Sequence, residues 1–116
     1  MAKVSARLGG YRMSAQKVRL VVDQIRGRQV EEALGILASS NKRMARPLAK
    51  LMRSALANAE EKNAREKAGI DVDNLYVSRV FVDEGTSQWR IRARAQGRAN
   101  WIQRRSSHVT IELEER

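Results

Sequence analysis

Residues 85–105, with the sequence GTSQWRIRARAQGRANWIQRR, constrain the fold of this chain more than any other segment. From Trp89 to Ala95 arginine alternates with Trp, Ile and Ala, and a period of two is typical of a β-strand. Gly97 lies near the middle of the segment, so a turn is expected there. The flanking residues 72–82 and 108–114 also have strand patterns. We therefore predict a long β-hairpin that projects from a sheet.

The remaining patterns predict one further strand and three helices. Residues 3–8 alternate as a half-buried strand does, and Gly9-Gly10 is expected to end it. The first helix is expected to begin after Ser14 as N-cap and to stop at Gly27, and the second spans about 31–38. The third runs from about 41 to 64 or a little beyond, and Pro47 kinks its opening turns or marks its true start. Its core stripe is Met44, Leu48, Leu51, Met52, Ala55 and Ala59.

This order of elements predicts an α+β fold. We expect three helices packed on a small three-stranded antiparallel sheet, with the long hairpin protruding from it. Residues 1–116 are expected to form a single domain in which 85–105 are the extended hairpin.

The composition narrows the possible functions. The chain has 23 Lys and Arg against 13 Asp and Glu, a formal net charge of +10, which indicates a polyanionic partner. The absence of cysteine excludes disulfides, cysteine-bound zinc and a thiol nucleophile. His108 is the single histidine, so a histidine metal cluster is excluded and metal-dependent hydrolysis is not expected. We find neither an apolar run of membrane-spanning length nor a secretory signal pattern in the sequence.

Basic side chains gather in three places. Arg43, Arg46, Lys50 and Arg53 recur at helical spacing on one face with no acid among them, so the face either binds phosphate or is simply solvated. The segment 12–28 holds five basic residues around one acid, Asp23, and some of them could instead form a local ion pair. The hairpin holds six arginines, no acid and both tryptophans, and indole rings stack on nucleobases.

Other interpretations of these features remain open. The hairpin could be a disordered basic loop whose two tryptophans pack on each other, or an Arg/Trp stretch that binds an anionic membrane. Asp71, Asp73, Asp83 and Glu84 could hold Mg²⁺ in a small nuclease, whose cleavage would be lost in Asp83→Asn. A free basic RNA-binding chaperone, which would bind many nucleic acids with little preference, is a further alternative. His108 is expected to be structural or to contact RNA.

Five stretches of the chain together resemble bacterial large-subunit ribosomal proteins of the L-twenty-two family. They are RMSAQKVRLVVDQIRG (12–27), SALANAE (54–60), VFVDEG (80–85), RARAQGRA (92–99) and RRSSHVTI (104–111). The resemblance implies a non-catalytic structural protein that binds 23S-type ribosomal RNA and helps the large subunit assemble, with the hairpin lining the nascent-peptide exit tunnel. Thr86 and Ala93 stand where the family commonly has proline, and Gln88-Trp89 and Gln96 also depart from its usual residues.

The resemblance also implies partners and a location. The expected partners are 23S-type rRNA, neighbouring ribosomal proteins including one of the L-four family, and the nascent peptide. No membrane, homo-oligomer, cofactor or metal is expected, and the location would be cytoplasmic, in the ribosome. The hairpin tip is expected at Gln96, Gly97 and Arg98. The predicted RNA-binding residues are Arg7, Arg12, Ser14, Lys17, Arg19, Arg26, Arg28, Arg43, Arg46, Lys50, Arg53, Trp89, Arg90, Arg92, Arg94, Arg98, Trp101, Arg104, Arg105 and His108.

Overall fold

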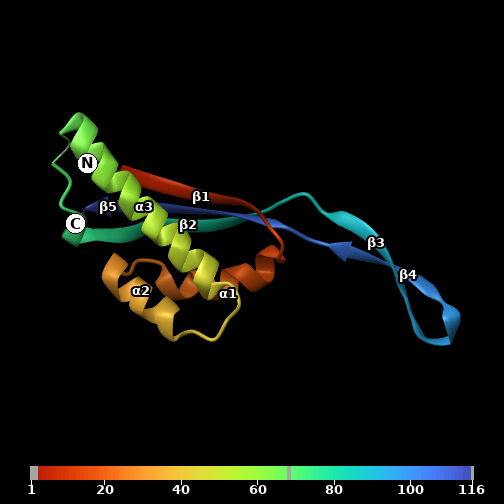
Figure 1. Ribbon diagram of the computed structural model, residues 1–116. Coiled ribbons are helices and arrows are strands. Elements are labelled where there is room, and N and C mark those ends of the chain that lie inside the picture. Colours follow the sequence, from red (N-terminus) through yellow and green to blue (C-terminus); the bar gives the residue numbers. More distant parts are fainter. Residues whose placement is uncertain (1–2, 68, 116) are drawn as a thin grey trace.

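A computed structural model describes residues 3–67 and 69–115 of the chain, and Figure 1 shows their arrangement. In chain order the elements are β1 (Lys3–Tyr11), α1 (Ala15–Ile25), α2 (Val30–Ser39), α3 (Ala45–Glu66), β2 (Leu75–Glu84), β3 (Gln88–Ala93), β4 (Ala99–Arg104) and β5 (Ser107–Glu115). Short 3₁₀ turns lie at Val72–Asn74 and Ala95–Gly97. The predicted architecture of three helices, a three-stranded antiparallel sheet and a separate hairpin is confirmed.

The last strand, β5, is the centre of the sheet. It pairs antiparallel with β1 on one side and with β2 on the other, so the strand order is β1-β5-β2. Val109, Ile111 and Leu113 are fully buried because they point to the helical side of the sheet, as their alternation with polar residues predicts. Their neighbours across the strands are also apolar, as in the pair of Ala6 with Ile111 and that of Val80 with Ile111.

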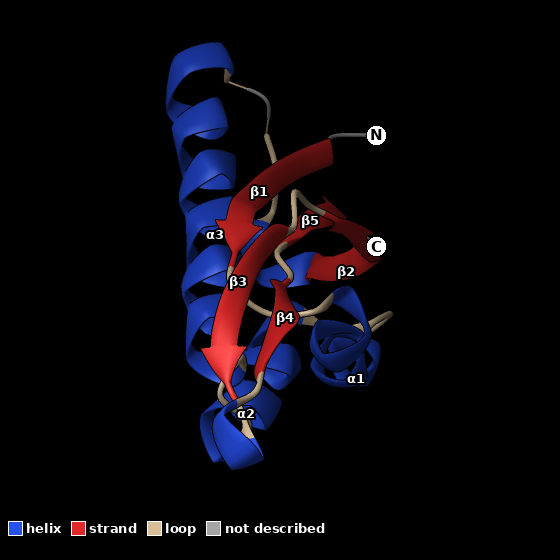
Figure 2. Ribbon diagram, turned by 90° about the vertical axis from the view of Figure 1, so that its right-hand side faces the viewer, coloured by secondary structure: helices blue, strands red, loops and turns tan. Residues whose placement is uncertain are grey.

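The three helices cover one face of this sheet and enclose a single core (Figure 2). α3 packs on β1, and α1 packs on β2. Leu48, Met52 and Ala55 of α3 have no exposed surface, which confirms the predicted apolar stripe of the long helix. The buried face of α1 is formed by Val18, Val22 and their neighbours at helical spacing.

The prediction that Gly9-Gly10 ends the first strand is wrong. β1 continues to Tyr11, and its register against β5 shifts by one residue between Leu8 and Tyr11. Gly10 has a φ of 66°, which glycine adopts without steric cost, so the strand forms a bulge there instead of stopping. The bulged Gly10 N–H donates to Nδ1 of His108 at 2.9 Å.

Two predicted boundaries also differ from the structure. α3 begins at Ala45 and not at Asn41, which places Pro47 in its first turn, where proline needs no hydrogen-bond donor. Val72–Asn74 form a 3₁₀ turn, so β2 begins only at Leu75. Asp71 holds this turn because its carboxylate accepts hydrogen bonds from the backbone N–H of Asp73 and the side chain of Asn74.

The hairpin makes the molecule elongated. β3 and β4 form a sheet of their own, and in Figure 1 they extend away from the body. The overall dimensions are 64 × 27 × 16 Å, and the radius of gyration is 17.5 Å. A compact domain of this length would have a radius of gyration of about 13 Å. The chain therefore orders an arm that buries little against its own body.

Gly85 connects β2 to the hairpin at a crowded point, and we expect Gly85→Ala to destabilise the protein. A Cβ there would lie 2.5 Å from Oγ of Ser106 and 3.1 Å from Nε2 of His108. Neither side chain moves freely, because Ser106 Oγ donates to the carbonyl of Thr86 and His108 accepts from Gly10. Urea denaturation should show a loss of about 1–2 kcal/mol.

Gly35→Ala provides the matched control. Gly35 lies inside α2, and no heavy atom lies within 4 Å of a Cβ built there. This variant should gain about 0.5–1 kcal/mol, because alanine restricts the unfolded chain more than glycine does. Equal stability of the two variants would contradict the crowding assigned to Gly85.

Candidate nucleic-acid interface

A groove of about 910 Å³ lies where the hairpin leaves the body. It is built from three parts of the chain: residues 10–17 around the start of α1, Arg43 before α3, and the root of the hairpin. Its basic lining residues are Arg12, Lys17, Arg43, Arg90, Arg104 and Arg105, and no acidic residue lines it. We call this site the root groove. It brings together members of all three predicted basic clusters.

The N-terminus of α1 opens into the root groove. Ser14 is the N-cap with extended backbone, as predicted, and its side chain makes no capping hydrogen bond. The first turn of the helix holds no acid. Free N–H groups and the positive end of the helix dipole favour an anion at such a position, and Lys17 in the same turn adds a full charge.

Backbone and side-chain hydrogen bonds join the two strands of the hairpin to each other at its root. Gly85 N–H donates to the carbonyl of Ser106 at 2.9 Å, and Ser106 Oγ donates to the carbonyl of Thr86 at 2.7 Å. Because β2 and β5 are neighbours in the sheet, the two strands of the hairpin start side by side. This geometry aims Arg104 and Arg90 into the groove next to α1.

The arginines of the hairpin are exposed and carry no acidic partner. β3 and β4 pair in register from Gln88 opposite Arg104 to Ala93 opposite Ala99, and the chain reverses at Ala95–Gly97. In the turn Gln96 and Gly97 both have positive φ, and Arg94 N–H donates to the carbonyl of Arg98 at 2.6 Å. Within the described residues, the ion pairs of the chain involve Lys3, Arg26, Arg28 and Arg65, none of them in the hairpin.

The basic face of α3 lies only partly at this groove. Arg43 precedes the helix and lines the root groove. Arg46, Lys50 and Arg53 are exposed on α3 and do not line the groove. They form a second basic surface, separate from the groove lining.

Three of the predicted RNA-binding arginines, all on α1 or just after it, bond to β2 or to an acidic side chain of the protein. Arg19 donates to the carbonyl of Val82 at 2.8 Å, and Arg26 donates to the carbonyl of Val80 at 3.0 Å. Both carbonyls belong to β2, the edge strand, so the guanidinium groups occupy acceptors that another strand could pair with. Arg26 also pairs with Asp23, and Arg28 pairs with Glu32. His108 likewise accepts a hydrogen bond from Gly10.

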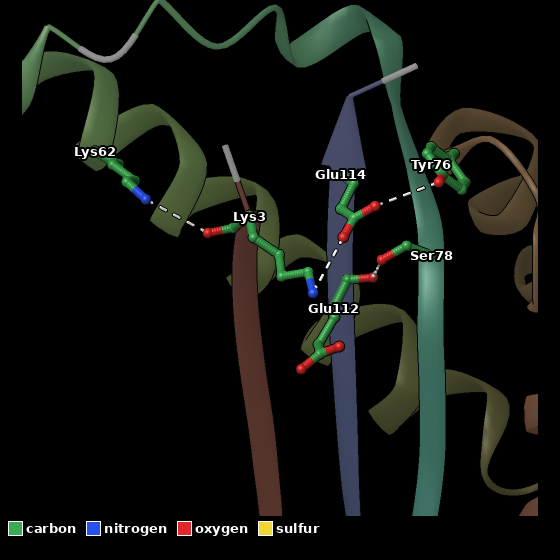
Figure 3. Close-up of polar contacts among 6 residues, drawn as sticks. All are labelled: Lys3, Lys62, Tyr76, Ser78, Glu112 and Glu114. Atoms are coloured by element: carbon green, nitrogen blue, oxygen red, sulfur yellow. Dashed lines mark hydrogen bonds and ion pairs between the residues drawn. The ribbon is translucent and has the colours of Figure 1, made fainter. Parts of the chain in front are cut away.

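The sheet face away from the helices differs from the root groove in its charge. Strand alternation places three cations there, Lys3, Arg7 and Arg79, and three anions, Asp83, Glu112 and Glu114. Figure 3 shows that Glu114 lies between Lys3, at 3.2 Å, and the hydroxyl of Tyr76, at 3.4 Å. Ser78 and Lys62 donate to backbone carbonyls of β5 and β1 in the same region. This face is balanced in charge, whereas all the charged side chains that line the root groove among the described residues are basic.

Several lining residues of the root groove were missed by the sequence analysis because they are uncharged. Gln16, Thr86, Gln103 and Ser106 line it together with the basic residues. Only Gln16 carried a usable signal, since it falls in the first turn of a helix that Ser14 was expected to cap. The other three become neighbours of α1 only through the pairing of β2 with β5.

The acidic residues considered for a magnesium site do not come together. Asp71 precedes β2 and Asp83 lies near its far end, and each residue of a strand adds about 3.3 Å. Among the described residues no group of three or more His, Asp or Glu side chains is placed to hold a metal ion. No helix within residues 3–67 and 69–115, the described residues, is long and apolar enough to cross a membrane.

The fold and the groove together are those of a small, basic α+β protein with a projecting, arginine-rich hairpin. The chain belongs to the ribosomal protein L22p/L17e family, whose sequence model matches residues 6–114. This match confirms the resemblance drawn from the five stretches. Membership in this non-enzymatic family implies a structural role in the large ribosomal subunit, among ribosomal RNA and other ribosomal components.

The intramolecular contacts of Arg19 and Arg26 predict a separation of roles on α1. Arg19→Gln and Arg26→Gln should each lower the free energy of unfolding by about 1–2 kcal/mol, because each leaves a β2 carbonyl without its charged donor. Lys17→Gln, on the same helix but facing the groove, should change stability by less than about 0.5 kcal/mol. Thermal or urea denaturation of the three variants measures this. Equal stability of the three variants would contradict the structural role assigned to Arg19 and Arg26.

Proposed function

We propose that this protein binds 23S-type ribosomal RNA through the root groove and the arginines of the hairpin, and that it stabilises the large subunit during assembly. The observation that carries the proposal is the root groove itself, where six basic side chains from three parts of the chain converge without an acid. These cations repel one another, and the negative phosphates of an RNA backbone would offset this repulsion by attracting each of them.

The arrangement of the basic surfaces supports binding to more than one RNA segment. The root groove combines charge with the N-terminus of α1, a combination suited to a backbone phosphate. The exposed cations Arg46, Lys50 and Arg53 on α3 form a separate surface. A protein that neutralises phosphates at both places ties two RNA segments together, which is a structural role and needs no turnover.

The hairpin extends this binding away from the body. We propose that it runs between RNA helices and that its tip, Gln96, Gly97 and Arg98, lines the nascent-peptide exit tunnel opposite a protein of the L-four family. The projecting form, the 64 Å length and the absence of acid from 85–105 support this placement. Membership in the L22p/L17e family supports it further.

A double substitution in the root groove tests the binding mode. Lys17→Gln with Arg104→Gln removes one cation from α1 and one from the hairpin. We expect affinity for a 23S-type rRNA fragment to fall on the order of tenfold per lost contact. The slope of log affinity against log salt should become shallower by about 0.7–0.9 for each contact.

The matched control removes the same charge far from the groove. Arg65 and Lys67 lie at the C-terminal end of α3 and do not line the groove, so Arg65→Gln with Lys67→Gln should leave affinity within about twofold. An equal loss in both double variants would show that net charge alone drives binding. That result would contradict a specific RNA site and favour a non-selective RNA chaperone.

A further inference from the structure

The strand register divides the hairpin into two unlike faces. Side chains alternate along each strand, so residues opposite one another in the register share a face. One face carries Gln88, Arg90, Arg92, Asn100, Ile102 and Arg104, and we call it the arginine face. The other carries Trp89, Ile91, Ala93, Ala99, Trp101 and Gln103, holds no charged residue, and is called here the apolar face.

The apolar face is open to solvent. Trp89, Ile91 and Trp101 are 57%, 62% and 66% exposed, and they are three of the four exposed large hydrophobic residues among those described. The fourth is Leu20, which belongs to α1 and not to the hairpin. Three large apolar side chains on one thin ribbon form a patch of the kind that marks a binding surface.

We propose that the apolar face is a stacking site for unpaired nucleobases of the same RNA whose phosphates the arginine face binds. This proposal rests on the proposed function and adds that the apolar face binds the unpaired bases of the RNA. Flat aromatic rings stack well on bases, whereas phosphate binding needs cations, and the hairpin places its tryptophans and most of its strand arginines on opposite sides.

Charge and continuity favour RNA as the occupant. Arg90 and Arg104 belong to the arginine face and also line the root groove, so one RNA strand can follow both without leaving the basic surface. No acidic residue occurs anywhere in 85–105 to repel it. A base-paired duplex hides the faces of its bases, so the site takes unpaired nucleotides, which present those faces to aromatic side chains.

The positions of the two tryptophans suit the stacking of a base. Trp101 lies directly opposite Ile91, and Trp89 lies opposite Gln103, so the two tryptophans are diagonal neighbours on one face. Diagonal positions across an antiparallel pair are about 7–8 Å apart. Stacked bases rise by about 3.4 Å each, so the separation of these two positions matches the spacing needed for one base between two rings.

Intrinsic fluorescence tests the proposal in the full chain, because Trp89 and Trp101 are its only tryptophans. The probes are a single-stranded oligoribonucleotide, an abasic strand with the same number of phosphates, a duplex of the same sequence, and vesicles of anionic phospholipid. We expect the single strand to quench the emission at saturation, and the abasic strand and the duplex to bind with little quenching.

Substitutions separate the two faces. Trp89→Leu with Trp101→Leu leaves no tryptophan, so its binding is measured by the anisotropy of a dye-labelled strand. This variant should weaken single-strand binding about fivefold to 150-fold per stacked base and leave the salt slope unchanged. Arg90→Gln with Arg92→Gln should instead make the slope shallower by about 0.7 per contact. Leu20→Ala, an exposed apolar residue outside the hairpin, is the control and should change neither quantity. Circular dichroism confirms that each variant is folded.

The outcomes distinguish this proposal from the proposed function. If the double tryptophan variant binds the single strand as tightly as the wild type, or if the abasic strand quenches equally, the stacking site is wrong while RNA binding stands. Quenching by the anionic vesicles with none by RNA overturns it in favour of a membrane surface. If the wild type binds none of the RNAs, the proposed function itself fails.

Discussion

The pairing of β5 with both β1 and β2 is the constraint on which the rest of the structure depends. It places Ile111 and its apolar neighbours at the centre of the core, under the three helices. The hairpin connects β2 to β5, and these strands are adjacent, so its two strands start side by side and pair outward. The bulge at Gly10 then lets β1 reach His108 beside the hairpin root. A change in this pairing would move the root groove along with the core.

Arginine side chains have two different roles in this structure. Arg19 on α1 and Arg26 just after it satisfy carbonyls of the edge strand β2, and this protects an edge that would otherwise be open to other strands. In the root groove and on the hairpin the guanidinium groups have no acidic partner among the described residues and face solvent. The sheet face away from the helices is balanced in charge, with ion pairs such as that of Lys3 with Glu114. The excess charge is therefore concentrated where the hairpin meets the body and along the hairpin itself.

Much of the fold could be predicted because its signals are local. The alternation in 108–114, the helical spacing of Val18, Val22 and Ile25, and the acid-free segment 85–105 each fix an element without reference to the rest of the chain. One error occurred where the residues permit two outcomes, because Gly9-Gly10 permits a bulge as well as a break. For Pro47 both a kink and the start of the helix were expected, and the structure places it in the first turn of α3.

The site was less predictable, because it is formed by tertiary contacts. The three basic clusters could be identified separately, but the convergence of Arg12, Arg43 and Arg104 on one groove depends on the strand order. The sequence also gave no sign that Arg19 bonds a carbonyl of β2, 63 residues away. The division of the hairpin into two faces required the register between β3 and β4, which the alternation of one strand alone does not determine.

The central claim is that this protein is held in the large subunit by RNA contacts that its body and hairpin make together. Sedimentation of the tagged protein from a cell lysate tests it most directly, in a sucrose gradient at low magnesium that separates the subunits, repeated after a high-salt wash. We expect near-stoichiometric protein in the large-subunit peak that survives the wash, because the proposed contacts are many and the surrounding RNA would shield them from salt. Protein at the top of the gradient, or protein removed by the wash, would contradict it.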